Sequence, residues 1–365
     1  MSPAAVAAAG LAALAVGMGI GRFAFTPVLP LMQADGLLSL AGGGWLAAAN
    51  YAGYLAGALS APFVRGALAV RAGLAATAAF TLAMAVQDDI ALWALLRGLA
   101  GVASAWVLIH VSAWVPLARP GLSGVVYAGV GVGSVLAGVL CVAVLQLDLA
   151  ARDAWLGLGL VAAAATVVLW PLFPEQGRRA APADAPGLRK DSVRLVLCYT
   201  AFGFGYIIPA TFIPAFARET LGDPALYGWA WPLFGAAAAA STVAVAPIVR
   251  RLGERRVWIG GHLVMAAGVA APLLIAGMTG IVVCALGVGA TFMVITMAGL
   301  QEGRKLGGAT VLAAMTSGFA AGQIAGPAFV ALLAYAGGRL EYASLTASLV
   351  LVAAAFALLP RSLQS

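Results

Sequence analysis

Apolar stretches of about 18 residues or more recur along the whole chain, separated by short charged or Pro- and Gly-rich breaks. A helix of about 20 apolar residues is long enough to cross the hydrocarbon core of a bilayer. The ninth and tenth stretches are separated only by the letters MTG, but their roughly 45 apolar residues are too many for one crossing. The pattern therefore predicts twelve membrane-spanning helices, at approximately 4–32, 41–64, 67–86, 90–116, 121–146, 154–173, 193–217, 225–249, 256–277, 279–301, 307–336 and 341–360.

The composition agrees with a membrane protein. Hydrophobic residues make up 63% of the 365 residues, charged residues make up 9%, and the mean hydropathy is +1.02. A soluble domain carries about 25% charged residues, so this chain is not one. The first apolar stretch lacks a basic region before it and is about twice as long as the apolar part of a secretory signal, so we expect it to remain as the first span.

The positions of Lys and Arg predict the orientation of the chain. Fifteen of these 20 residues fall in breaks on the same side as the N-terminus, and three, Arg152, Arg218 and Arg339, fall on the other side. Because basic residues accumulate in cytoplasmic loops, both termini are predicted to be cytoplasmic, in a bacterial inner membrane. The same bias explains the net charge of +7, with anionic lipid as its neighbour and no need for nucleic acid.

The longest polar segment, residues 174–192, is rich in proline and charge and predicts a cytoplasmic linker between two halves, 1–173 and 193–365. The halves show an internal repeat. Gly19 matches Gly203 at an offset of 184, APFVR matches APIVR at 185, GVASAWVLI matches GVGATFMVI at 186, and the glycine pair 129 and 133 matches 318 and 322 at 189. This order predicts two pseudo-symmetric six-helix bundles, related by an axis along the membrane normal.

Several segments are similar to a known family. GIGRFAFTPVLPLM, followed by ANYAGYLAGAL, resembles the YbfB/YjiJ-type branch of the major facilitator superfamily. RGLAG, residues 97–101, resembles the RxxxG motif of proton-coupled members, and RRLGERR, residues 250–256, resembles the DRxGRR loop with Arg250 in the place of Asp. The resemblance implies alternating access: two bundles rock about a site near the midplane, lined mainly by spans 1, 4, 7 and 10.

Arg22 and Arg97 lie within spans one and four. An arginine at such depth costs about 2.5 to 3.5 kcal/mol, so it is expected to face a cavity or a partner. Structural alternatives are open: Arg22 could snorkel or bond carbonyls freed by Pro27, and Arg97 could pair with Asp88 or Asp89. All 13 acidic residues fall in loops or at span ends, however. Two buried cations without an acid favour an anionic substrate group, a carboxylate or a phosphate.

Other polar residues are placed beside these arginines by helical spacing. Asn50 and Tyr54 share one face of span two, and Tyr206 in span seven occupies the position of Arg22 by the repeat offset. Tyr127 in span five could instead belong to the membrane-interface belt in which tyrosines gather. The predicted substrate-binding residues are Arg22, Asn50, Tyr54, Arg97, Tyr127, Tyr206 and Gln323.

Several chemistries are not expected. The chain has no phosphate loop, His110 and His262 cannot make a metal site by themselves, and the three cysteines lie in different spans without metal-ligand spacing. No catalytic constellation lies within the spans, so we expect neither an enzyme nor a cofactor. The sequence favours a monomeric secondary transporter of a small organic anion, with a co-transported proton suggested by RxxxG. The alternatives are efflux of a hydrophobic or cationic compound, a non-transporting sensor and a passive channel.

Overall fold

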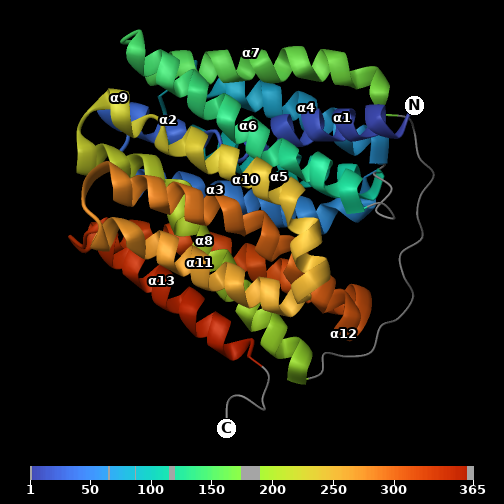
Figure 1. Cartoon of the computed structure of the whole chain (residues 1–365). Helices are drawn as coiled ribbons and strands as arrows, with labels where there is room; N and C mark the ends of the chain where they lie inside the picture. The colour runs from blue at the N-terminus through green and yellow to red at the C-terminus, as the bar shows by residue number, and fades with distance from the viewer. Residues whose placement is uncertain (1, 65, 87, 115–119, 174–189, 360–365) are drawn as a thin grey trace.

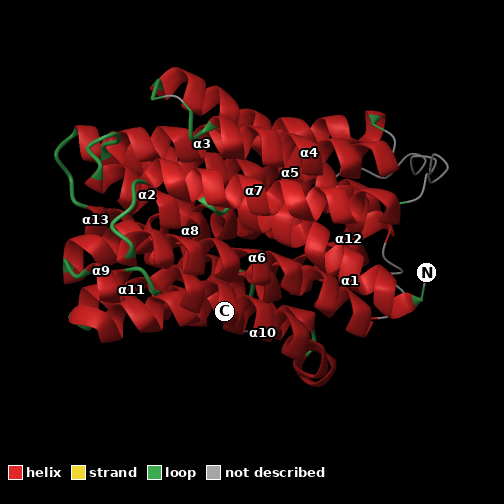
Figure 2. Ribbon diagram, turned by 90° about the horizontal axis from the view of Figure 1, so that it is seen from above, coloured by secondary structure: helices red, strands yellow, loops and turns green. Residues whose placement is uncertain are grey.

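The structure is a computed structural model that describes residues 2–64, 66–86, 88–114, 120–173 and 190–359. Every regular element in these ranges is a helix, and most long helices lie side by side (Figure 1, Figure 2). The predicted all-α membrane fold is confirmed. In chain order the elements are α1 (Pro3–Leu14), η1 (Ala15–Ile20), α2 (Phe25–Ala34), α3 (Leu40–Ser60), η2 (Ala61–Phe63), α4 (Gly66–Ala83), α5 (Ile90–Trp114), α6 (Pro120–Gln146), α7 (Ala151–Leu169), η3 (Trp170–Leu172), α8 (Lys190–Leu221), α9 (Pro224–Tyr227), α10 (Ala230–Leu252), α11 (Glu254–Leu274), α12 (Gly277–Tyr335) and α13 (Leu340–Ala357).

Eleven stretches of the described helices are long and apolar enough to cross a membrane. The predicted second span, α3, is not among them, although its 21 residues extend for about 31 Å. Its glycines, Asn50 and tyrosines lower its hydropathy. Because α3 packs between α5 and α12 along with the other long helices, it completes the predicted set of twelve crossings.

Helix α12 contains two of these spans, Gly277–Leu306 and Val311–Tyr335. The sequence predicts the division between these spans at residues 302–306, and the two spans are indeed separate. The backbone at the division differs from a loop, because it stays helical. The helix nevertheless turns back: a Cβ atom on Gly303 would collide with the sulfur of Met315. In a straight helix these residues would be about 18 Å apart. The tenth and eleventh spans are therefore a tight helical hairpin.

The first span is not a continuous α-helix. Between α1 and α2 lies the π-helical turn η1, in which the amides of Gly21 and Phe23 donate to the carbonyls five residues earlier, those of Val16 and Met18. Residues 21–24 then form a turn before α2 begins. A π-helical turn widens a helix locally and is frequent at functional sites. Arg22 lies at this irregular point.

Close helix contacts recur in the two halves at the spacing of the sequence repeat. A Cβ atom on Gly133 would collide with the carbonyl of Ala15, and one on Gly322 would collide with the carbonyl of Thr200. Only glycine lets the helix backbones approach so closely. The first span thus packs on the fifth as the seventh packs on the eleventh.

A second pair of contacts follows the same repeat. Arg71 donates from Nη2 to the carbonyl of Phe173 at 2.9 Å, and Arg255 donates from Nε to the carbonyl of Leu358 at 3.1 Å. The two arginines are 184 residues apart in the sequence. Each donates to a backbone carbonyl at the end of the last helix of its half, where the helix itself supplies no donor. The contacts support equivalent packing of the two six-helix halves.

One predicted match of the repeat needs adjustment. A Cβ atom on Gly101 would collide with the carbonyl of Asn50, on the second span. Its predicted equivalent, Gly287, approaches Gly268 on the ninth span instead. Gly289 is the residue that meets the eighth span, at the carbonyl of Phe234. By contact, the offset at this point is therefore 188 residues and not 186.

The two ends of the helix bundle are defined by the chain. We call the end where α7 stops and α8 starts the linker end, and the opposite end the far end. Helix α1 also starts at the linker end (Figure 1). Arg194, near the start of α8, donates to the carbonyl of Leu359, which places the end of α13 there as well. Of the predicted linker, 174–192, residues 174–189 lie outside the described residues, and residues 190–192 form the start of α8.

Candidate functional site

A buried polar cluster joins the two halves at the level of Arg22. Nη2 of Arg22 donates a hydrogen bond to Oε1 of Gln323 on α12, and Nε2 of Gln323 donates to the Tyr206 hydroxyl on α8 at 3.0 Å. The exposed fractions of the three side chains are 3%, 0% and 1%. A cation of the N-terminal half thus bonds directly to the C-terminal half, where water does not reach it.

Two tyrosines of α3 cover the Arg22 guanidinium. Its central carbon lies 3.9 Å from the ring centroid of Tyr54 and 4.9 Å from that of Tyr51. A cation over an aromatic face is attracted by the ring quadrupole, more strongly when both groups are desolvated. The Tyr51 hydroxyl also shares a hydrogen bond of 3.1 Å with the Thr211 hydroxyl on α8. These rings orient the guanidinium towards the junction between the halves.

Arg97 lies one step behind Arg22, inside the N-terminal half. Its Nη2 donates to the backbone carbonyl of Arg22 at 2.8 Å, and its exposed fraction is 1%. That carbonyl is available because the Thr26 amide bonds to Phe23 and not to Arg22. The Arg97 guanidinium carbon lies 5.5 Å from the ring centroid of Phe25 and 5.7 Å from that of Trp155. Arg97 therefore holds the backbone turn that presents Arg22.

Asn50 supports the same arrangement from α3. Its Nδ2 donates to the carbonyl of Arg97 at 2.7 Å, within the N-terminal half. Its Oδ1 is buried and has no hydrogen-bond partner among the described atoms. Asn50 thus ties α3 to α5 beside the two buried arginines.

Neither buried arginine has a carboxylate partner among the described residues. The ion pairs there involve Arg194, Arg255, Lys305 and Arg339, which lie near helix ends or at the turn of the α12 hairpin. The Nε atoms of Arg22 and Arg97 are buried and unpaired within the same part of the chain. A buried charge without a counter-ion is costly, and each unpaired buried donor adds to that cost. The cluster is thus electrostatically incomplete.

The structure brings most, but not all, of the predicted residues together. Four of the seven meet at the junction and two lie behind it, while Tyr127 donates to Ser112 at 2.9 Å on α5 and, among the described residues, is not hydrogen-bonded to the cluster. The four at the junction are Arg22, Tyr54, Tyr206 and Gln323. Tyr51 and Thr211 were missed. Tyr51 could have been found because it is three residues before Tyr54 and shares its helix face.

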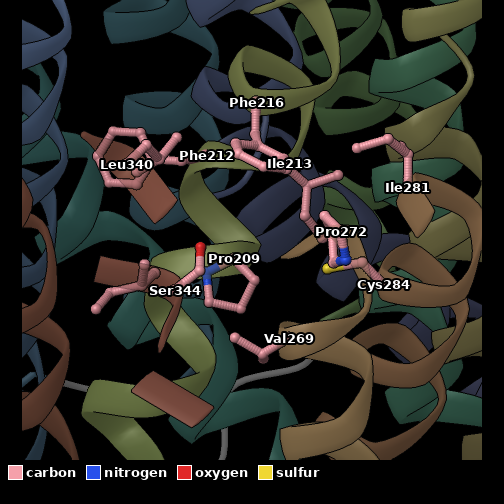
Figure 3. A pocket seen from close by; sticks show the side chains of 11 residues that line it. Pro209, Phe212, Ile213, Phe216, Val269, Pro272, Ile281, Cys284, Leu340 and Ser344 are labelled. Atoms are coloured by element: carbon pink, nitrogen blue, oxygen red, sulfur yellow. The ribbon is translucent and has the colours of Figure 1, made fainter. Parts of the chain in front are cut away.

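A small apolar pocket lies elsewhere, within the C-terminal half (Figure 3). It has a volume of about 20 Å³ and is lined by side chains of α8, α11, α12 and α13, among them Pro209, Phe212 and Leu340. No charged residue lines it. It contains none of the predicted substrate residues and is separate from the polar cluster.

The halves are joined by side-chain hydrogen bonds from the middle of the bundle to its far end. The Thr26 hydroxyl donates to the carbonyl of Ala210 at 2.9 Å, and Arg218 donates to the carbonyl of Pro30 at 3.3 Å. Together with the contacts of Arg22 and Tyr51, these are the described side-chain hydrogen bonds between the halves. These four bonds therefore hold the halves together from the middle of the bundle towards its far end.

Comparison with known proteins places the chain in a family. Residues 14–359 match the family model described as "Uncharacterised MFS-type transporter YbfB". The crystal structure of the human organic anion transporter MFSD10 (TETRAN) is similar in fold, with a TM-score of 0.67 and 16% sequence identity. The match covers 98% of this chain and 100% of that one. Among curated proteins, none matches this chain in sequence. The family match covers nearly the whole chain, so this protein belongs to the YbfB family of membrane transporters, in the major facilitator superfamily.

Proposed function

We propose that this protein is a secondary active transporter that moves a small organic anion across the bacterial inner membrane by alternating access. The main observation behind this proposal concerns Arg22. It is a buried cation at the junction of the halves and has no carboxylate partner among the described residues. A carboxylate or phosphate group would supply the missing charge and would accept hydrogen bonds in the planar geometry of a guanidinium. The organic anions named for the similar structure MFSD10 are compatible with this proposal.

The contacts indicate how binding would couple to movement. Gln323 occupies one donor of Arg22 in the present state. An incoming anion would replace the neutral amide oxygen with a charged acceptor, which bonds a guanidinium more strongly. Because Arg22 and Gln323 belong to different halves, exchanging that bond changes how the halves are held together. In this proposal the substrate shifts the balance between states by binding them with different affinity.

The alternatives predict different ligands. A cationic compound would be repelled by Arg22, and a sensor would bind without moving its ligand across the membrane. The orientation is part of the proposal, with the linker end cytoplasmic, where the described Arg250, Arg251 and Arg256 are found. Proton coupling, suggested by RxxxG, is a further part. Uptake that rises with an imposed proton gradient supports it, and uptake indifferent to that gradient contradicts it.

The test uses the purified full-length protein in liposomes, with labelled benzoate, a labelled phosphate monoester and labelled tetraphenylphosphonium as probes. Because tetraphenylphosphonium and neutral benzoic acid cross bilayers unaided, protein-free liposomes supply the baseline. We expect saturable uptake of at least one anion above this baseline and no uptake of the cation above it. Arg22→Gln should abolish anion uptake while the protein still folds, and Arg22→Lys should restore it in part, because an ammonium keeps the charge but not the two-pronged geometry. Arg152→Gln removes an exposed arginine and is the matched control. Wild-type uptake by Arg22→Gln, or uptake of the cation, would overturn the proposal.

A further inference from the structure

Five aromatic rings of the C-terminal half form one nearly parallel series, which we call the aromatic ladder. Its members, in spatial order, are Trp231, Phe234, Phe292, Tyr206 and Phe319. Successive centroids are 4.4, 5.5, 5.5 and 5.7 Å apart, and successive interplanar angles are 9°, 17°, 5° and 7°. Aromatic pairs favour such offset stacking at centroid separations of about 4.5 to 7 Å.

The ladder is assembled by the tertiary fold and reaches the junction between the halves. Its rings come from α8, α10 and both arms of the α12 hairpin. Phe23, the residue after Arg22, lies with its ring centroid 6.2 Å from that of Trp231 and 6.2 Å from that of Phe292. Gln323 connects the same ladder to the Arg22 guanidinium through the Tyr206 hydroxyl. The buried ladder is therefore linked to the Arg22 guanidinium through one side-chain amide.

The number of charges at this place is limited. Arg97 is turned into the N-terminal half and bonds to a backbone carbonyl, so among the described residues Arg22 is the cation that meets Gln323 and the ladder. A second carboxylate on the ligand would lie among aromatic rings without a cationic partner, at a large desolvation cost. One donor does remain beside the rings: the fully buried Trp231 Nε1 has no hydrogen-bond partner among the described atoms. It suits a neutral acceptor of the ligand and does not require a second charge.

We propose that the substrate is a planar aromatic monoanion, whose carboxylate binds Arg22 and whose ring system stacks on the aromatic ladder. This inference rests on the proposed function and narrows its substrate class. Arg22 selects the charge, and the ladder selects a flat apolar body over an aliphatic or doubly charged one. Stacked aromatic rings attract each other by more than the burial of their apolar area accounts for. An aromatic acid should therefore bind more tightly than a saturated acid of the same carbon skeleton.

The first experiment measures affinities of the purified wild-type protein by calorimetry. The probes are naphthalene-2-carboxylate, its saturated decahydro analogue, naphthalene-2,6-dicarboxylate and the neutral naphthalene-2-carboxamide. We expect the first to bind at least about fivefold more tightly than the saturated acid, in line with the known strength of aromatic pairing. The dicarboxylate and the amide should bind more weakly still. Equal affinity for the aromatic and saturated acids, or tighter binding of the dicarboxylate, would overturn the inference without requiring any variant.

The second experiment tests the ladder itself. Phe292→Leu should reduce the preference for the aromatic over the saturated acid about threefold or more, because it removes a central ring but keeps an apolar side chain. Phe329→Leu is the matched control: Phe329 packs on Phe204 at 5.8 Å, outside the ladder, and its loss should leave the preference unchanged. An unchanged preference in Phe292→Leu contradicts the inference. If Phe292→Leu does not fold, the same comparison is made with Phe319→Leu.

The outcomes separate this inference from the proposed function. If organic anions bind in an Arg22-dependent way but show no aromatic preference, the substrate class is wrong and the transporter proposal stands. If Arg22→Gln binds naphthalene-2-carboxylate as the wild type does, both fail.

Discussion

Arg22 and Tyr206, which are 184 residues apart, bond to opposite ends of one side-chain amide, that of Gln323. By the sequence repeat the two residues occupy equivalent positions in their halves. One is a cation and the other a neutral ring with a hydroxyl group. At these positions the N-terminal half thus contributes a cation and the C-terminal half an aromatic ring to one hydrogen-bonded cluster.

Gln323→Glu should stabilise the present arrangement of the polar cluster. A carboxylate at this position would be the counter-ion that Arg22 lacks, and a charge-assisted bond is about twice as strong as the neutral bond it replaces. We expect a higher melting temperature and at least a tenfold loss of anion uptake in liposomes. Gln323→Leu is the comparison, because it removes both hydrogen bonds and should lower the melting temperature. Wild-type uptake by Gln323→Glu would show that substrate does not compete for Arg22.

Arg97 should behave as a positioning residue. Arg97→Gln leaves the buried carbonyl of Arg22 without its donor, a change that costs about 1 to 3 kcal/mol of stability. The maximal uptake rate should fall, while the anion dissociation constant of the folded protein changes less than about threefold, well below one pairing interaction. Arg97→Lys should recover much of the stability by donating to the same carbonyl. A rise in the dissociation constant as large as that for Arg22→Gln would instead make Arg97 a direct ligand, as the sequence predicted.

Tyr51 and Thr211 should help to hold the two halves together. A double-mutant cycle with Tyr51→Phe and Thr211→Val should give a coupling energy of about 0.5 to 1.5 kcal/mol in the stability of the purified protein. Thr166→Val provides the control, since the Thr166 hydroxyl bonds within its own helix, to the carbonyl of Ala162. Strictly additive effects of the Tyr51 and Thr211 substitutions would mean that the hydrogen bond between the two hydroxyls does not contribute to stability.

The orientation predicted from Lys and Arg can be checked in cells. Reporter fusions after Ser365 and within residues 174–192 should both report a cytoplasmic location, because fifteen basic residues lie on that side against three on the other. A fusion after Asp148, between α6 and α7, should report the opposite side. A periplasmic signal from the linker fusion would invert the proposed topology.

The sequence indicated the architecture because a bilayer imposes simple rules on a chain. Spans must be apolar and about 20 residues long, which located most of the helices, and charge is confined to their ends, which singled out Arg22. The repeat offset by itself relates Arg22 to Tyr206. Hydropathy does not report local backbone structure. It located the division between the tenth and eleventh spans, but it did not show that the backbone of α12 stays helical there.

Only the tertiary structure decided what each polar side chain does. Arg22 and Arg97 look alike in sequence, yet the Thr26 amide bonds to Phe23 and so leaves the Arg22 carbonyl free. Arg97 donates to that carbonyl, while Arg22 bonds to the other half. The aromatic ladder could not be foreseen either, because its rings come from helices far apart in sequence and their mutual tilt is set by helix packing. Periodicity reports which face of a helix a residue occupies. Which partner it meets depends on how the helices cross, and that is a property of the whole fold.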